Sequence, residues 1–247
     1  MLECTIPEDF SAGLPPKFSN ICPNLDKSPT LHSRATEDEM NRKEHWNQFY
    51  QTKAPDKVSW FQTWPAISLQ LIEATRIGKD ESIIDVGGGA SVLVDFLLEA
   101  GFTKLAVLDI SATALGHARK RLGAKAHHIE WFETDVTDFN PEHRFNLWHD
   151  RAVFHFLTEK DDRRKYLQTL KQTLALEGNV IIATFAIDGP LKCSGLDVAR
   201  YDAPSICAKL GTGFRLIEQV DETHVTPWNT EQKFSYFRFI QNPDALP

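Results

Sequence analysis

Short apolar runs alternate with amphipathic segments along the chain from about residue 80 onward. The runs predict strands, and the segments between them carry apolar residues at helical spacing. Strands separated by helices pair in parallel and are covered on both faces, so the pattern predicts a doubly wound α/β domain. We expect strands at 82–86, 105–109, 129–134, 145–148 and 179–185, with helices at 91–100, 111–122 and 159–176, the last ended by Gly178.

The alternation stops after Phe185. A loop with glycine, proline and cysteine covers residues 186–201, and a short helix is expected at 202–210. Two further strands, 214–220 and 233–240, lie close enough in sequence to pair antiparallel. We therefore expect a seven-stranded, mostly parallel sheet with an antiparallel last strand.

The N-terminal segment reads differently. Residues 1–35 contain five prolines and no hydrophobic periodicity, which predicts a flexible extension. A capping box formed by Thr36 and Glu39 then predicts the start of a helix that continues through Tyr50.

A second N-terminal helix is expected after Pro65, because proline is tolerated in a first helical turn. Ile67, Leu71 and Ala74 follow at helical spacing. The chain is thus divided into the extension and a single domain, 36–247, whose residues 36–78 form a helical cap.

Composition limits the choice of partner. At 247 residues and 42% hydrophobic content, the chain can bury one sizeable core. Its formal net charge of -7 argues against a nucleic-acid partner, because phosphate binding depends largely on clustered lysine and arginine. A small molecule or a protein is the expected partner.

The four cysteines, Cys4, Cys22, Cys193 and Cys207, show neither C-x-x-C spacing nor a disulfide framework. We expect free thiols in a reducing compartment, no structural zinc and no other metal. The first thirty residues lack the apolar core of a signal peptide, and no run is long enough to span a membrane. These features predict a cytoplasmic protein without a membrane partner.

A strand followed by three glycines is the strongest candidate binding site. Asp85 ends the strand and precedes Gly87, Gly88 and Gly89. Residues without a Cβ permit a tight turn and bring backbone N–H groups close to a ligand. The third glycine of a dinucleotide fingerprint would fall at Val92, which disfavours that class, whereas a plain strand-to-helix turn remains open as an explanation.

Two more aspartates follow strand ends. Asp109 can accept hydrogen bonds from ribose hydroxyls, and Asp135 can accept one from an exocyclic adenine amine. Helix capping is a competing role for Asp109, which shortly precedes Ser111. Because the carboxyl ends of parallel strands share one edge, both aspartates and Asp85 are expected to converge there.

From about Glu44 to Gln241 the sequence resembles class I S-adenosylmethionine-dependent methyltransferases of the type 11 and type 12 kind. The resemblance implies a Rossmann-like methyltransferase fold and S-adenosyl-L-methionine as cofactor. It also implies a donor site in which the first loop holds the methionine part, Asp109 the ribose and Asp135 the adenine. The implied residues are Asp85, Gly87, Gly88, Gly89, Asp109, Ile110, Asp135 and Val136.

One departure concerns the family's D-x-G-x-G-x-G, in which Ser91 replaces the final glycine. This variant is similar to the subgroup of citrate synthase and elongation-factor lysine methyltransferases, as are Glu44-His45-Trp46 and Tyr236-Phe237-Arg238-Phe239. The subgroup's D-K-G-T-x-D-A motif is not preserved, because the chain instead has Asp150-Arg151-Ala152-Val153-Phe154-His155-Phe156.

The expected acceptor side is neutral to basic. A lysine acceptor, with a reference pKa of ~10.4, needs more help to lose its proton than a thiol, whose reference pKa is ~8.5. Carboxylates and aromatic walls suit a lysine acceptor better than a neutral-to-basic site does. The candidate bases are Asp150 and His155, the second of which could equally be a core histidine. The candidate substrate contacts are Trp60, Arg151, Cys193, Arg200 and His224.

Each contact has a simpler explanation. Arg151 could pair with an acid, Cys193 could be an ordinary loop thiol, and Trp60 could pack the cap on the sheet. Arg200 and His224 reach the acceptor only if their loops fold over the sheet edge. The sequence therefore predicts methyl transfer to a small-molecule nucleophile such as a thiol, with a protein-lysine methyltransferase and a non-catalytic donor-binding scaffold as alternatives.

Overall fold

A computed structural model describes the backbone of residues 31–242 and the side chains of residues 42–242. The first thirty residues of the predicted extension, with Cys4 and Cys22, lie outside the described residues, as do the side chains of Thr36 and Glu39. The first helix begins at Leu31, earlier than the predicted start at Thr36.

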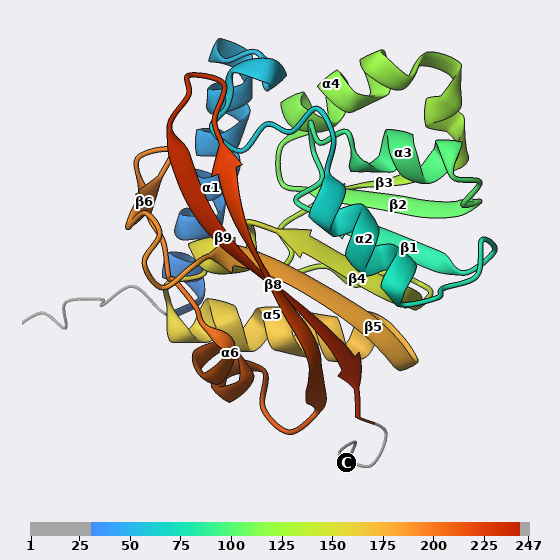
Figure 1. The fold of residues 1–247 in the computed structure, drawn as a ribbon. Helices are drawn as coiled ribbons and strands as arrows, with labels where there is room; N and C mark the ends of the chain where they lie inside the picture. The colour runs from blue at the N-terminus through green and yellow to red at the C-terminus, as the bar shows by residue number, and fades with distance from the viewer. Residues whose placement is uncertain (1–30, 243–247) are drawn as a thin grey trace, which may run out of the picture.

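Figure 1 shows a central sheet flanked by helices. The strands of this sheet are β1 Ser82–Val86, β2 Lys104–Asp109, β3 Ile129–Glu133, β4 Phe145–Arg151, β5 Leu174–Phe185, β8 Phe214–Val225 and β9 Glu231–Gln241. The α-helices are α1 Leu31–Thr52, α2 Ala66–Ala74, α3 Leu93–Glu99, α4 Ala112–Leu122, α5 Lys160–Thr173 and α6 Ala203–Leu210. Short 3-10 turns lie at Pro55–Lys57, Gly123–His128 and Phe154–Phe156.

The strand order is β3-β2-β1-β4-β5-β9-β8. Pairing is parallel from β3 to β5, and β9 pairs antiparallel with both β5 and β8. The seven-stranded, mostly parallel sheet with an antiparallel last strand is therefore confirmed. The order reverses between β1 and β4, and ligands of open α/β sheets bind in the crevice outside the carboxyl ends of such strands.

Alternating side chains of the strands build two cores, one on each face. Ile84 of β1 belongs to the core that packs against α5 and α6. Ile83, its neighbour, belongs to the core that packs against α2, α3 and α4. Because both faces are covered here, β1 and β2 are buried along nearly their whole length, as the sequence pattern indicated.

The structure corrects the predicted boundary between α5 and β5. The helix ends at Thr173, and Gly178 lies inside β5 rather than after the helix. Leu174 is fully buried and pairs with Phe145 of β4, and the register then shifts so that Asn179 pairs with Leu147. Strand pairing of a buried leucine thus overrides the amphipathic pattern that extended the helix to residue 176.

The loop at 186–201 also differs from the prediction, because it contains a small hairpin. Its strands are β6 Lys192–Cys193 and β7 Leu196–Asp197. Within the part of the chain that the structure describes, no helix has the length and apolar character needed to cross a membrane.

Candidate functional site

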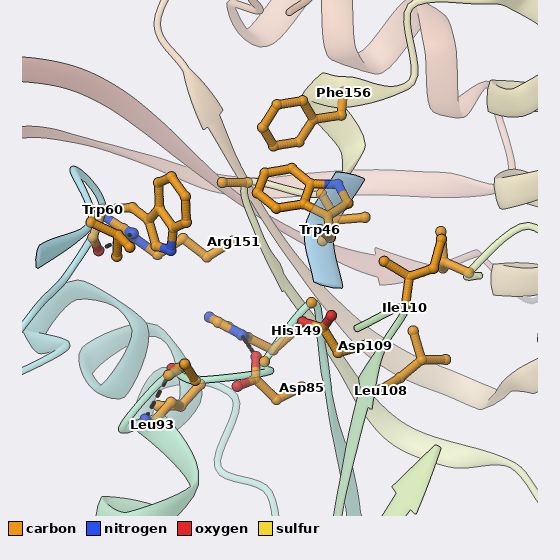
Figure 2. Close-up of a pocket in the computed structure, with 18 of the residues that line it drawn as sticks. Trp46, Trp60, Asp85, Leu93, Leu108, Asp109, Ile110, His149, Arg151 and Phe156 are labelled. Atoms are coloured by element: carbon orange, nitrogen blue, oxygen red, sulfur yellow. Dashed lines mark hydrogen bonds and ion pairs between the residues drawn. The ribbon is translucent and has the colours of Figure 1, made fainter. Parts of the chain in front are cut away.

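A cavity lies at the carboxyl edge of β1, β2 and β4, where the strand order reverses (Figure 2). Its floor includes Asp85 and Asp109, and its roof includes Trp46 of α1 and Trp60 of the following loop. Seven of the eight predicted donor-site residues line the cavity. Five of these seven are acidic or follow an acidic residue: Asp85, Asp109, Ile110, Asp135 and Val136. Gly87 and Gly88 line it as well.

The glycines are needed for the shape of the loop between β1 and α3. Gly87 has φ +68, and its N–H and that of Gly88 donate to the Leu108 carbonyl over 2.7 and 3.2 Å. A Cβ on Gly88 would lie 2.5 Å from Asp85 Oδ2, and one on Gly89 would lie 2.3 Å from Asp109 Oδ2. Gly89 does not line the cavity, so its role is to leave room for Asp109.

Ser91, the departure from the family pattern, lies two residues before the start of α3. Its Oγ accepts a hydrogen bond of 3.1 Å from the Leu93 N–H. Arg121 of α4 supports the same loop by donating to the Ala90 and Ser91 carbonyls over 3.1 and 2.5 Å. A serine at this position therefore satisfies an N–H at the helix start, which glycine, having no side chain, could not do.

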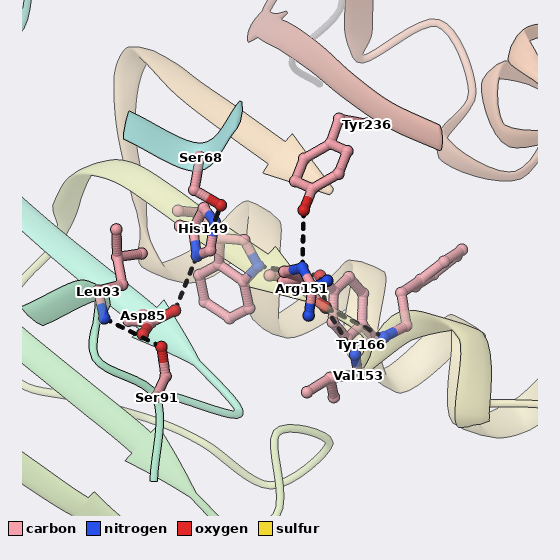
Figure 3. Close-up of polar contacts among 12 residues, drawn as sticks. Ser68, Asp85, Ser91, Leu93, His149, Arg151, Val153, Tyr166 and Tyr236 are labelled. Carbon is pink, nitrogen blue, oxygen red and sulfur yellow. Dashed lines mark hydrogen bonds and ion pairs between the residues drawn. The ribbon is translucent and has the colours of Figure 1, made fainter. Parts of the chain in front are cut away.

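Asp85 belongs to a buried hydrogen-bond chain that reaches α2 (Figure 3). His149 Nδ1 lies 2.7 Å from Asp85 Oδ1, and His149 Nε2 lies 2.9 Å from Ser68 Oγ. All three side chains line the cavity. The second carboxylate oxygen, Oδ2, is buried and has no partner among the described residues.

Asp109 lies at the end of β2 and is buried. Its Oδ1 accepts a hydrogen bond of 2.8 Å from the Ser111 N–H. Ser111 Oγ in turn accepts from the Ala114 N–H, which makes Ser111 and not Asp109 the N-cap of α4. Burial raises the pKa of Asp109 to about 7, an effect that the nearby Asp85 charge increases.

Asp135 follows β3 and uses its two oxygens differently. Oδ1 accepts from the backbone N–H and the hydroxyl of Thr137, each over 2.8 Å. Oδ2 pairs with Arg42 of α1 at 3.2 Å. Val136 is buried beside it and gives this end of the cavity an apolar wall, together with Ile110.

The roof is a cluster of aromatic rings. Trp46 meets Phe156 edge to face at 5.1 Å and Trp60 at 6.0 Å, and Phe49 stacks on Trp60 at 5.5 Å. The helix that carries Trp46 is fixed to α4, since Asn47 Oδ1 accepts from the Ser111 hydroxyl over 2.9 Å. Ser111 therefore both caps α4 and anchors the helix that carries Trp46.

Arg151, at the end of β4, lines the cavity and holds the loop of Trp60. Its Nη1 donates to the Trp60 carbonyl over 3.0 Å, and its Nε donates to Tyr236 Oη over 2.7 Å. Nη2 lies 3.5 Å from Glu222 Oε2, an ion-pair distance without a hydrogen bond. Its charge is thus matched by an acid, which is the simpler of the two roles that the sequence allowed.

Of the other predicted substrate contacts, Trp60 and Cys193 line the cavity. Burial raises the pKa of the Cys193 thiol to about 11, which keeps it protonated at neutral pH. Arg200 and His224 do not line it: the first donates to the Gly189 carbonyl, and His224 Nε2 lies 2.7 Å from the Ser59 carbonyl.

The two candidate bases also lie off the cavity. The Asp150 carboxylate accepts from the N–H groups of Val153 and Phe154 and from Tyr166 Oη, so it holds the turn after β4. His155 is fully buried, and burial and the Arg151 charge lower its pKa to about 3. Neither side chain lines the cavity, so the assignment of either residue as the base stays a prediction that this geometry does not favour.

The lining fits a nucleoside that carries an amino acid. Asp85 keeps a buried oxygen without a partner, which suits an ammonium group, and Asp109 offers a carboxylate to hydroxyls. Ile110 and Val136 provide apolar walls for a flat base, and Asp135 lies beside them. The glycine loop leaves no Cβ in the way.

Sequence reasoning did not place Ser68, Arg42, Arg121 or His149 at the donor side of the cavity. Ser68 and Arg42 lie on helices far from the glycine loop in sequence, and a polar residue on an amphipathic helix usually faces solvent. The available signal was the position of His149 in β4, an ionisable residue inside an apolar strand that needs a buried partner.

Comparisons with known proteins agree with this geometry. Residues 83–178 match the family model of a methyltransferase domain. The "eEF1A lysine and N-terminal methyltransferase" of Mus musculus is 23% identical over 146 residues, which are 58% of this chain and 20% of that protein. "Malonyl-[acyl-carrier protein] O-methyltransferase 1" of Ilyobacter polytropus is 27% identical over 108 residues, 43% of this chain and 39% of that protein. The chain thus spans about a fifth of the mouse relative's length.

Solved structures share the fold. The structure described as "Conversion of a Disulfide Bond into a Thioacetal Group during Echinomycin Biosynthesis" aligns with a TM-score of 0.66 at 19% identity, covering 81% of this chain and 93% of that chain. N-methyltransferase NodS from Bradyrhizobium japonicum, in complex with S-adenosyl-l-homocysteine, aligns with a TM-score of 0.58 at 17% identity, covering 79% of this chain and 97% of that chain.

Proposed function

We infer that the chain carries a class I methyltransferase domain. We propose that it transfers the methyl group of S-adenosylmethionine to a small-molecule nucleophile such as a thiol. One observation carries the proposal. Asp85, Asp109 and Asp135 follow three neighbouring strands and line a single cavity together with the glycine loop.

Each part of the donor has a counterpart in this lining. Asp85 would hold the ammonium of the methionine part, Asp109 the ribose hydroxyls and Asp135 the adenine amine, between the apolar walls of Ile110 and Val136. When bound, the donor supplies an electrophilic methyl group on a sulfonium. The residues of this chain orient the two reactants and exclude water, which is most of what an in-line displacement requires.

The acceptor side favours a nucleophile that loses its proton readily. His149 has both nitrogens in hydrogen bonds, and the Cys193 thiol stays protonated. Arg151 is matched by Glu222. Because none of these residues is free to act as a strong base, a thiol, with a reference pKa near ~8.5, fits better than an amine near ~10.4.

The roof supports a small acceptor. Trp46, Trp60 and Phe156 cover the cavity with apolar rings, and α1 is anchored to α4 above it. A covered, aromatic-walled cavity suits a compact molecule with an apolar body. An extended protein segment would first have to displace part of this roof.

A protein amine is the second candidate, because aromatic walls also suit a lysine side chain. The printed name of the mouse relative concerns lysine and N-terminal methylation of another protein. Incubation with tritiated donor and either a thiol panel or denatured lysate separates the two candidates. We expect label in the small-molecule extract, and label confined to protein bands would replace the first candidate with the second.

The non-catalytic alternative is tested in the same assay. Asp109→Ala serves as the variant with a damaged donor site, and Gly116→Ala, where an added Cβ meets nothing within 4 Å, serves as the matched control. Transfer by the wild type and the control but not by Asp109→Ala supports catalysis. Tight binding of S-adenosylhomocysteine without transfer to any acceptor would support a donor-binding scaffold.

A further inference from the structure

Asp85 and His149 are direct neighbours in the sheet. Asp85 of β1 pairs in register with His149 of β4, and both side chains are buried, with 4% and 2% of their surfaces exposed. They lie on the two strands between which the strand order reverses. A charged carboxylate at such a depth requires hydrogen-bond partners.

The hydrogen bonds determine which carboxylate oxygen is free. A carboxylate only accepts, so His149 Nδ1, at 2.7 Å, carries a proton and donates it to Asp85 Oδ1. In the neutral imidazole Nε2 then accepts from the Ser68 hydroxyl at 2.9 Å. Oδ1 is thereby occupied, whereas Oδ2 is buried without a partner beneath Gly88.

Ser68 connects this arrangement to the cap. It lies in the first turn of α2, is 1% exposed and lines the cavity with Asp85 and His149. The carboxylate sets the histidine tautomer, and the Ser68 hydroxyl at Nε2 holds the imidazole ring in the orientation from which Nδ1–H orients the carboxylate. Figure 3 shows the three side chains in one row from α2 to the end of β1.

We propose that His149 and Ser68 are positioning residues that hold Asp85 with one oxygen reserved for the ammonium group of the donor's methionine part. The proposal rests on the proposed function, because it concerns the same donor site. In the proposed arrangement neither residue contacts the donor's nucleoside. Their effect is therefore confined to ligands that carry the amino acid.

Two ligands separate a positioning role from a structural one. S-adenosylhomocysteine carries the ammonium, and 5′-methylthioadenosine has the same nucleoside without the amino acid. In His149→Phe a ring of similar size has no nitrogen, whereas in His149→Asn the amide N–H replaces Nδ1. Dissociation constants of both ligands are measured by calorimetry for each folded variant.

We expect His149→Phe to weaken S-adenosylhomocysteine binding at least about tenfold and to leave 5′-methylthioadenosine binding within about twofold. His149→Asn should restore most of the loss. Ser68→Ala, which removes only the outer bond, should weaken S-adenosylhomocysteine binding by about threefold to tenfold. Thr173→Val is the matched control, since Thr173 is a buried hydroxyl of α5 that does not line the cavity.

The outcomes are distinct. Equal weakening of both ligands, or no weakening of either, would overturn the positioning role. If His149→Phe does not fold, Ser68→Ala with the same two ligands decides the question. Failure of the wild type to bind either ligand would count against the proposed function itself. That outcome is distinct from failure of the positioning role, which is judged from the variants.

Discussion

Arg42 of α1 pairs with Asp135, the acid that follows β3 and lines the cavity, over 3.2 Å between Nη2 and Oδ2. Its Nη1 also donates to Asp162 Oδ2 on α5 over 2.8 Å. One arginine therefore connects the cap helix to the donor site and to a helix of the main domain. The side chains of the Arg42–Asp135 pair are 25% and 11% exposed, so water screens this pair only in part.

Arg42→Met should loosen α1 and leave the rest of the fold intact. The methionine keeps an apolar stem and loses both ion pairs, and we expect amide hydrogen exchange in residues 43–52 to rise about threefold to tenfold. Lys43→Met is the control on the same helix, because the Lys43–Glu133 pair is 45% and 44% exposed. Unchanged exchange in Arg42→Met would mean that aromatic packing alone holds the cap.

Donor binding should tighten as the pH rises through about 7. The pKa of Asp109 is raised to about 7 by burial, whereas ribose hydroxyls would donate to its ionised form. The dissociation constant of S-adenosylhomocysteine should therefore increase about tenfold from pH 8 to pH 6. Calorimetry over this range measures the effect, with proton release on binding near pH 6.

Two variants identify the titrating group. Asp109→Asn should bind weakly at every pH and lose the pH dependence. Asp150→Asn should retain it, although burial also raises the pKa of Asp150, to about 6, because Asp150 does not line the cavity. A slope that persists in Asp109→Asn would assign the titration to another residue.

The alternation of strands and helices was sufficient to predict the sheet, because the central strands β1 and β2 are buried on both faces and contain continuous apolar runs. The same pattern placed Asp85, Asp109 and Asp135 correctly on one edge. The end of a strand can be recognised from the local sequence, and in a parallel sheet the carboxyl ends of the strands lie at the same edge.

The acceptor side could not be predicted in this way. The segment that begins at Asp150 holds three polar residues, Asp150, Arg151 and His155, and the sequence does not tell which of them faces the cavity. The Asp150 carboxylate accepts hydrogen bonds from three donors, and the His155 ring lies in the core beside Phe185. Ser68 and Arg42 reach the site from helices, and their contacts depend on how the cap packs.

Gly89→Ala should abolish most donor binding without unfolding the protein. The new Cβ would lie 2.3 Å from Asp109 Oδ2 and 2.8 Å from Ala114 Cβ, so the carboxylate or α4 must move. We expect at least about tenfold weaker binding of S-adenosylhomocysteine, since a displaced Asp109 loses charge-assisted hydrogen bonds.

Gly116→Ala provides the contrast. Gly116 lies in α4, and an added Cβ meets nothing within 4 Å. Alanine in a helix is favoured over glycine, so the free energy of unfolding should rise by about 0.5–1 kcal/mol with donor binding unchanged. Equal losses of S-adenosylhomocysteine binding in Gly89→Ala and Gly116→Ala would show that α4 tolerates no substitution. The explanation of the Gly89→Ala loss by displacement of Asp109 would then be wrong.

His155 should contribute to stability and not to methyl transfer. It is fully buried, its Nδ1 lies 3.4 Å from the Phe185 N–H, and its pKa is lowered to about 3 by burial and by the Arg151 charge. An unfolded histidine titrates near ~6.5, so below that pH the unfolded chain binds more protons than the folded protein. The contribution of neutral His155 is complete above about pH 6.5 and is lost as the pH falls toward 3.

His155→Leu removes this group and keeps an apolar side chain in its place. We expect the stability difference between wild type and variant, measured by urea unfolding, to shift in favour of the variant as the pH falls from 7 to 5, since leucine cannot be protonated. Comparing the two proteins cancels the other titrating groups. The rate of transfer per folded molecule should stay within about twofold, and a loss of a hundredfold or more with intact donor binding would restore His155 as the base.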